Sequence, residues 1–201
     1  MTIDTKDMLN SILQSLSRID YVKPQDIPNI DLYMDQVTTF MESQLGSTRR
    51  YNEDKILTKT MINNYTKNNL LPPSVKKKYS REHMLLLILI YYFKNILSIK
   101  DIETVLEPLR EKYFSTDSAL QLSDIYREVC EMEKSRIEPM KASVREAYGK
   151  SQSSFENVPD GEEKDKLQLF TFICSLSFDV YLKKMMIEKI VDELASKDKK
   201  E

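Results

Sequence analysis

The longest apolar stretch of the chain is Met84–Phe93, ten residues without a single charge. A stretch of this length cannot cross the hydrocarbon core of a bilayer, which needs roughly 20 residues. It therefore predicts a helix buried inside a folded protein. Ser80 is placed to cap this helix and Glu82 lies in its first turn, where a negative charge suits the helix dipole. We expect the helix to begin after Ser80 and to end near Leu97.

The rest of the chain is also predicted to be helical. It has 201 residues, of which 41% are hydrophobic, so it can bury a core. It contains only three glycines and no tryptophan, and so few glycines leave little means of making tight hairpins or phosphate-cradling loops. The predicted fold class is therefore all-α, with one short β wing.

Three helices are expected before the apolar stretch. The first has its apolar residues at 3-4 spacing from Met8 to Ile19, with Asp4 or Thr5 as its cap, and it ends before Pro24. The second is Met34–Leu45, with Gly46 as its C-terminal stop.

The third helix is predicted to run from the N-cap Thr58 to about Asn68. Asn69 suits the left-handed conformation that closes a helix, and Pro72-Pro73 prevents continuation. A short, lysine-rich extended segment then leads to Ser80.

Further helices follow the apolar stretch. Ser98 and Asp101 form a capping box for a short helix whose apolar face is Ile99, Ile102, Val105, Leu106 and Leu109. The next pattern, Leu122–Tyr148, has an apolar face that includes Leu122, Ile125, Val129 and Met132, and Pro139 is expected to kink or break the helix. Residues 151–163 form a linker, and Lys166–Ser196 is a strong helix with several apolar faces.

Positive charge is concentrated in one segment. Residues 49–83 contain nine basic and three acidic residues, a net charge of +6, although the whole chain carries −2. Such a patch favours a polyanion such as duplex DNA through counterion release, whereas a solvated charged surface is the alternative that charge alone leaves open. The basic residues are Arg49, Arg50, Lys55, Lys59, Lys67, Lys76, Lys77, Lys78 and Arg81.

The order of elements favours DNA. A polar helix, a proline turn, a lysine-rich hairpin and a capped apolar helix follow one another, which is an arrangement of helix-turn-helix proteins. We expect a recognition helix near 58–69 and a basic wing near 74–79. The candidate DNA-binding residues are Thr58, Lys59, Thr60, Asn63, Asn64, Lys67, Lys76, Lys77, Lys78 and Arg81.

These residues carry a resemblance to a known family. Tyr65 and the segment Asn69–Pro72 resemble the end of the recognition helix in winged helix-turn-helix regulators of the MerR family, and Tyr79, Ser80 and Glu82 resemble the end of its wing. The segment Leu97–Ile102 resembles the turn that follows. The resemblance implies a DNA-binding transcriptional regulator. It places Asn63 where that family usually has a DNA-contacting arginine, and Lys77 at a basic position of the wing.

The chain also resembles a narrower group of uncharacterised bacterial proteins, described only as a domain of unknown function. Residues 31–45 and 57–106 carry this second resemblance. We expect an N-terminal helix in residues 1–24, a winged helix-turn-helix domain in residues 25–110, and a C-terminal helical domain in residues 111–201 for dimerisation or an effector.

Other functions find little support in the sequence. It has no glycine-rich phosphate loop and no nucleophile elbow, so we do not expect an enzyme, and no cofactor or metal is predicted. The single histidine, His83, is expected at the surface or in a cap, with a phosphate contact as the lesser alternative. Cys130 and Cys174 are expected to be free, buried thiols, with a disulfide as the lesser alternative. The start of the chain lacks a signal-peptide pattern, so we expect a cytoplasmic protein with no membrane association.

The predicted partners are double-stranded DNA and a second copy of the chain. MerR-type proteins dimerise through a helix that follows the DNA-binding domain, and Leu122–Tyr148 and Lys166–Ser196 are the candidates. The apolar faces of the latter could equally pack on their own chain. Two alternatives remain: a helical protein-interaction module that kept the fold without DNA binding, favoured by Asn63 and the long loop 46–56, and an unknown small-molecule effector bound by the second half.

Overall fold

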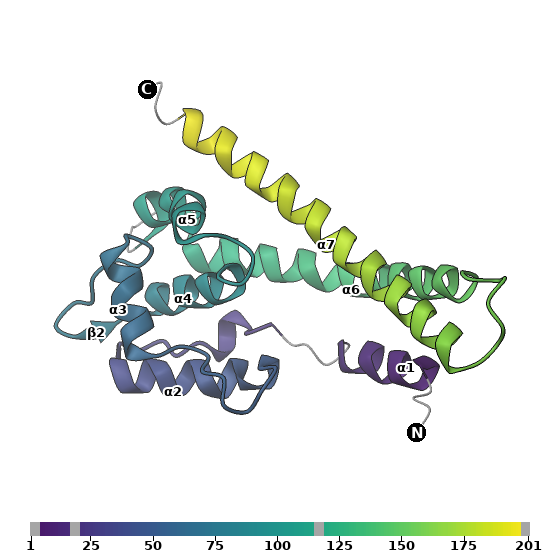
Figure 1. Cartoon of the computed structure of the whole chain (residues 1–201). Coiled ribbons are helices and arrows are strands. Elements are labelled where there is room, and N and C mark those ends of the chain that lie inside the picture. Colours follow the sequence, from purple (N-terminus) through teal and green to yellow (C-terminus); the bar gives the residue numbers. More distant parts are fainter. Residues whose placement is uncertain (1–4, 17–20, 115–118, 198–201) are drawn as a thin grey trace. The chain divides into compact units, whose positions relative to one another are not determined.

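A computed structural model describes residues 5–16, 21–114 and 119–197 (Figure 1). These residues are mostly helical and include one two-stranded antiparallel sheet, which confirms the helical class and the small β element. The chain divides into two compact units. The first contains the described residues of Met1–Asp20 and Glu131–Ile187, and the second those of Tyr21–Cys130 and Glu188–Glu201. No described helix is long and apolar enough to cross a membrane.

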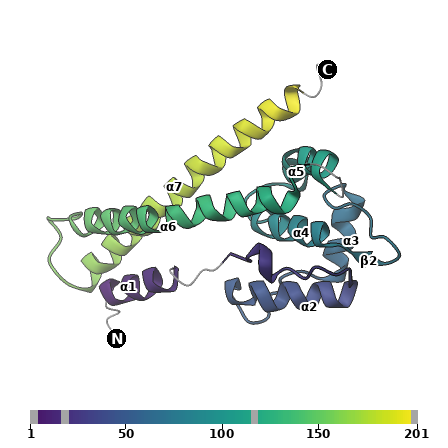
Figure 2. The same ribbon diagram turned by 180° about the vertical axis from the view of Figure 1, so that it is seen from behind.

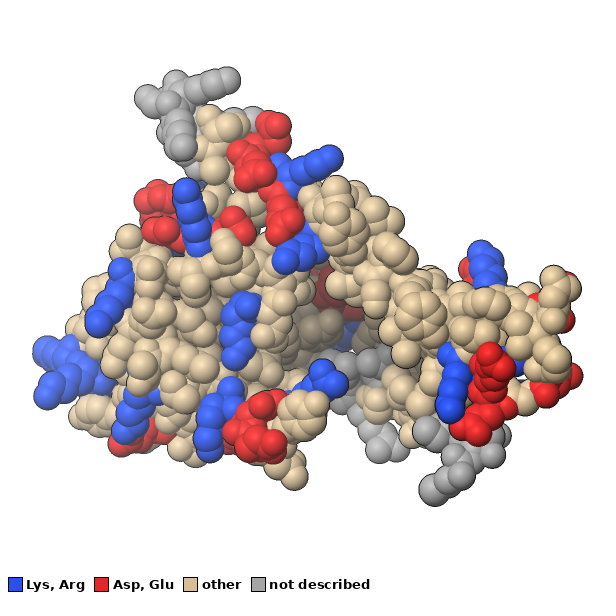
Figure 3. Space-filling model, viewed as in Figure 1, with Lys and Arg blue, Asp and Glu red and all other residues tan. Residues whose placement is uncertain are grey.

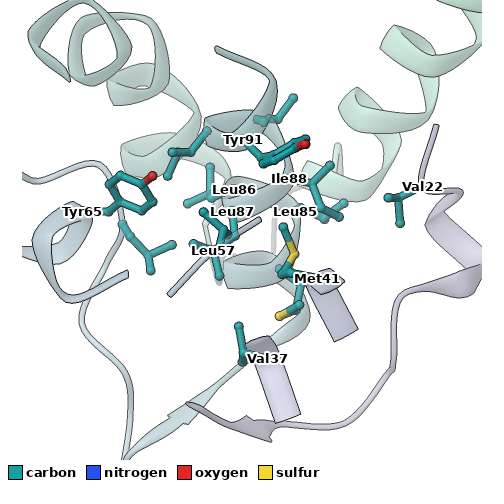
Figure 4. Packing of buried hydrophobic residues seen from close by; sticks show 14 of the residues in the cluster. Val22, Val37, Met41, Leu57, Tyr65, Leu85, Leu86, Leu87, Ile88 and Tyr91 are labelled. Atoms are coloured by element: carbon teal, nitrogen blue, oxygen red, sulfur yellow. The ribbon is translucent and has the colours of Figure 1, made fainter. Parts of the chain in front are cut away.

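The second unit is built around the predicted apolar helix, α4 (Arg81–Phe93). Every residue from His83 to Tyr91 is buried, as expected for a helix that is apolar on all sides (Figure 4). Its neighbours in the unit are β1 (Leu32–Tyr33), α2 (Met34–Leu45), α3 (Lys59–Lys67), β2 (Lys78–Tyr79) and α5 (Ile99–Tyr113).

The core around α4 draws on all of these helices. Its members include Val37, Met41 and Leu45 of α2, Ile62 and Tyr65 of α3, and Ile102 and Leu106 of α5. Figure 4 labels Val37, Met41 and Tyr65 among them. A buried aliphatic side chain contributes about 1.5–3 kcal/mol, so α4 alone accounts for a large part of the driving force. Tyr91 is buried and Tyr92 and Phe93 are half-buried against this core, so the aromatic run is core packing, as predicted.

The core also extends past residue 110, where the predicted domain ends. Leu122, Tyr126 and Cys130 come from the start of α6 (Leu122–Gln152) and are buried in the same cluster. The Tyr126 hydroxyl donates a 2.7 Å hydrogen bond to the carbonyl of Val22, so both ends of the unit's main segment are joined inside the core. Cys130 and Cys174 are free, but only Cys130 is buried, and Cys174 is half-buried.

The boundaries of α2 agree with the prediction, and the helix ends at its predicted stop, the C-cap Gly46. The φ of Gly46 is −57°, so the stop is not left-handed, and the chain continues as a 3-10 turn over Gly46–Thr48. The fourth helix, in contrast, ends earlier than predicted, at Phe93 instead of near Leu97. After Phe93 the chain tightens into a turn in which the Ile96 amide bonds the Phe93 carbonyl at 2.9 Å.

The capping box of α5 is as predicted. The Asp101 amide donates to the Ser98 hydroxyl at 3.2 Å, and the Ser98 amide donates to the Asp101 carboxylate at 3.1 Å. The helix is longer than expected, and Ile99, predicted on its apolar face, is 37% exposed.

The first unit joins α1 (Thr5–Leu16) to parts of α6 and α7 (Glu162–Lys197). Leu9 and Leu13 of α1 form a small cluster with Phe172 of α7. Pro139 lies inside α6 without ending it, so the predicted break is wrong. The predicted apolar face of this helix is confirmed only at its start: Leu122 is buried and Ile125 is half-buried, whereas Val129 and Met132 are 39% and 54% exposed. The predicted Asp4 cap and Ile19 lie outside the described residues.

Candidate nucleic-acid interface

Helix α3 is held firmly at both ends. The Thr58 hydroxyl accepts a 3.2 Å hydrogen bond from the Met61 amide, which makes Thr58 the predicted N-cap. At the other end Asn69 has a φ of 57°, the predicted left-handed closing position. The Leu70 amide then bonds the Tyr65 carbonyl at 2.9 Å, and Leu70 is buried. The short helix is therefore fixed by its caps and by the leucine that follows it.

The same helix divides sharply into a buried and an exposed face. Ile62 and Tyr65 point into the core, and burial raises the pKa of the Tyr65 hydroxyl. The opposite face is exposed and polar. It brings together five of the predicted DNA-binding residues: Lys59, Thr60, Asn63, Asn64 and Lys67.

The exposed side chains of α3 differ in whether they already form an ion pair or a hydrogen bond within the protein. Lys59 forms an ion pair with Asp35 of α2. The Asn68 side-chain amide donates to the Asn64 side-chain oxygen at 3.1 Å. The side chains of Thr60, Asn63 and Lys67 make no hydrogen bond or ion pair with any residue that the structure describes. These three side chains are available to a ligand without breaking an existing contact.

The lysine-rich segment after α3 forms a tight hairpin. Val75 and Lys78 exchange backbone hydrogen bonds of 3.0 and 2.9 Å, and Lys76 and Lys77 form the two-residue tip with φ of 51° and 63°. Positive φ at both positions is the requirement of a type I′ turn, which glycine and asparagine normally satisfy. Only residues 78–79 form a strand, and they pair with β1. The tip therefore presents two exposed lysines on strained backbone.

Two other predicted residues are held against their own chain. The Lys78 ammonium lies 5.2 Å from the centre of the Tyr33 ring, and the Arg81 guanidinium donates to the Pro24 carbonyl at 2.7 Å. Both side chains are half-buried. In Figure 3, lysine and arginine side chains gather at the edge of the second unit where β2 lies. The freely exposed charges of the hairpin are those of Lys76 and Lys77.

His83 is buried, so the expectation of a surface histidine was wrong. Its Nδ1 accepts a hydrogen bond from the Ser80 amide at 3.0 Å, which gives it the predicted capping role. Its ring packs edge-on against Tyr79 and Phe114. Burial lowers the pKa of His83, so the imidazole is neutral and stabilises the start of α4. Nothing in this position suits a phosphate contact.

A hollow of about 620 Å³ lies beside the start of α3. Its lining includes Arg49, Arg50, Lys55 and Lys94, together with acidic Glu53 and Asp54. Arg49 is engaged by Glu42 at 2.7 Å, and the Lys94 ammonium donates to the Ile56 carbonyl at 2.9 Å. Lys94 is the C-cap of α4 and lies more than thirty positions further along the chain than the other basic residues of this group, so no local sequence pattern could have placed it here.

The chain belongs to a family described as Domain of unknown function (DUF1836), which matches residues 22–129. The matched region has nearly the same bounds as the main segment of the second unit, Tyr21–Cys130. It therefore includes α3, the hairpin, the core around α4 and the start of α6. No curated protein and no solved structure matches the chain.

Proposed function

We propose that this protein is a DNA-binding transcriptional regulator of the MerR-like winged helix-turn-helix type. In this proposal α3 enters the major groove and the hairpin tip contacts a neighbouring phosphate strand. The supporting observation is the exposed polar face of α3, directly followed in the chain by the Lys76-Lys77 tip. In Figures 1 and 2 the ribbon of α3 lies next to that of β2, the strand that follows the tip. Lysine, asparagine and threonine are residues that contact phosphates and base edges.

The local structure around α3 supports the MerR-like assignment. Tyr65 and the segment Asn69–Pro72, which carry the resemblance in sequence, form the anchored end of α3. Tyr79 and Ser80 occupy the junction between hairpin and α4. α2 packs against α3, as the first helix of a helix-turn-helix does, although a long loop connects the two.

The proposal includes a homodimer, because two-fold symmetric proteins read paired half-sites. Its support is the part of α7 that belongs to the first unit. Large apolar side chains there are each more than half exposed, and exposed apolar patches of this kind mark interaction surfaces. They are Phe170, Ile173, Phe178, Val180, Tyr181, Leu182 and Met186.

The salt dependence of binding to duplex DNA tests the proposal. Each lost phosphate contact lowers the slope of log K against log salt by about 0.9. A Lys76→Ala/Lys77→Ala variant should bind more weakly, with a slope reduced by about 1.8. Two exposed lysines outside the matched region supply the control. Lys134→Ala/Lys189→Ala removes the same charge and should leave the slope unchanged.

Equal slopes for the two double variants would exclude the hairpin as a DNA contact. Absence of duplex binding at low salt, together with a specific protein partner in a pull-down, would favour the helical interaction module instead. Sedimentation of the same preparation tests the dimer, since a monomer at micromolar concentration would contradict that part of the proposal.

A further inference from the structure

The exposed face of α3 has an unusual chemical composition for a basic DNA-binding helix. It contains two adjacent asparagines and no arginine. At about 100° per residue, Asn63 lies one turn from both Lys59 and Lys67, in the middle of a stripe along the outward face. An amide therefore occupies the centre of this stripe, with a cation on each side.

The two amides differ in what they can still bind. The Asn64 side-chain oxygen already accepts a hydrogen bond from Asn68. Asn63 is exposed and makes no hydrogen bond with another described residue, so both its amide nitrogen and its amide oxygen are unused. Asn63 is therefore the side-chain amide on this face that can offer a donor and an acceptor side by side without sharing either with a neighbour.

A donor and an acceptor side by side match one base in particular. In the major groove adenine presents the N7 acceptor next to the N6 amino donor, whereas guanine presents two acceptors, N7 and O6. An amide can satisfy both groups of adenine at once but only one group of guanine. The neighbouring Thr60 carries a methyl group, which suits contact with the methyl group of thymine.

We propose that Asn63 selects an adenine within each DNA half-site, donating from Nδ2 to N7 and accepting at Oδ1 from the N6 amino group. This inference rests on the proposed function and adds the base that the site recognises. Lys59 and Lys67 then hold the phosphates on either side of the recognised base pair. An A·T pair at the centre of each half-site is the expected target.

The test uses the full chain and a duplex obtained by selection from a random library. Each adenine is replaced in turn by 7-deazaadenine, which lacks the N7 acceptor. We expect one adenine per half-site at which this change weakens binding about ten- to a hundredfold. For Asn63→Ala the same change should have no further effect. Asn157→Ala, an exposed asparagine outside the matched region, is the control and should keep the full sensitivity.

A second variant of Asn63 tests the proposal through a gained base preference instead of a lost one. Arginine pairs with guanine through O6 and N7, so Asn63→Arg should shift the preferred base from adenine to guanine at that position. The inference is overturned if Asn63→Ala remains as sensitive to 7-deazaadenine as the unaltered protein, or if no adenine is sensitive. A protein that binds a selected sequence but fails this test keeps its proposed function, whereas one that selects no sequence loses both.

Discussion

Replacing the hairpin tip Lys76-Lys77 by Asn-Gly should stabilise the protein and weaken its binding to DNA. Both lysines have positive φ, a region that costs an L-residue roughly 1–2 kcal/mol. Asparagine and glycine are the residues that a type I′ turn prefers. Glycine loses about 0.5–1 kcal/mol of this gain through the entropy of the unfolded chain. The expected net gain is about 1–2 kcal/mol.

The measurement is urea unfolding followed by circular dichroism. With a denaturant dependence of about 2 kcal/mol per molar urea, the midpoint should rise by roughly 0.5–1 M. Lys76→Ala/Lys77→Ala is the matched control, because it removes the same charges but keeps side chains on strained backbone. Its midpoint should change little, and both double variants should lose the same slope in the salt dependence of DNA binding.

A variant that is more stable but binds DNA more weakly cannot be explained by damage to the fold, because such damage would lower stability as well. If the Asn-Gly variant is no more stable than the alanine variant, the strain at the tip is not as described. If it gains stability but binds DNA as before, the turn is correct and its role in binding is wrong.

Three further changes test the fold that positions the site. Burial lowers the pKa of His83, so below about pH 6.5 the unfolded chain takes up a proton that the folded chain does not. The free energy of unfolding should therefore fall by up to about 1.4 kcal/mol for each unit of decreasing pH. In urea unfolding between pH 7 and 5.5, His83→Gln should flatten this dependence. Tyr126→Phe removes the buried hydrogen bond to Val22 and should cost about 1–3 kcal/mol, whereas no loss would mean that this bond does not hold the segment. Thr58→Ala removes the cap of α3 and should cost about 1 kcal/mol, which thermal unfolding can detect, while Thr58→Ser should retain most of it.

Local sequence signals predicted the elements around the site well. Thr58, Asn69 and Ser98 act through their own backbone and near neighbours, so their capping and closing roles could be predicted without the tertiary structure. The same holds for the apolar helix α4, because a run of ten uncharged, mostly aliphatic residues is stable only where it is buried. The exposed face of α3 follows from its buried residues at helical spacing.

What sequence reasoning missed depends on long-range contacts. The burial of His83 is caused by Tyr79 and by Phe114, which lies on a distant segment. Arg81 bonds a carbonyl at Pro24, and Lys94 reaches Ile56, so neither position could be assigned from its neighbours in the chain. The positive φ of the hairpin tip was also hidden, because lysine is not a residue that turn statistics place there.

The most direct test of DNA binding is selection of duplexes from a random library with the purified chain. We expect enrichment of an inverted repeat whose half-sites each contain an essential A·T pair, with half-site centres about 10 base pairs, or a multiple of that, apart. A sequence pool no different from the starting library after several rounds would contradict the assignment of α3 and the hairpin as a DNA-binding surface.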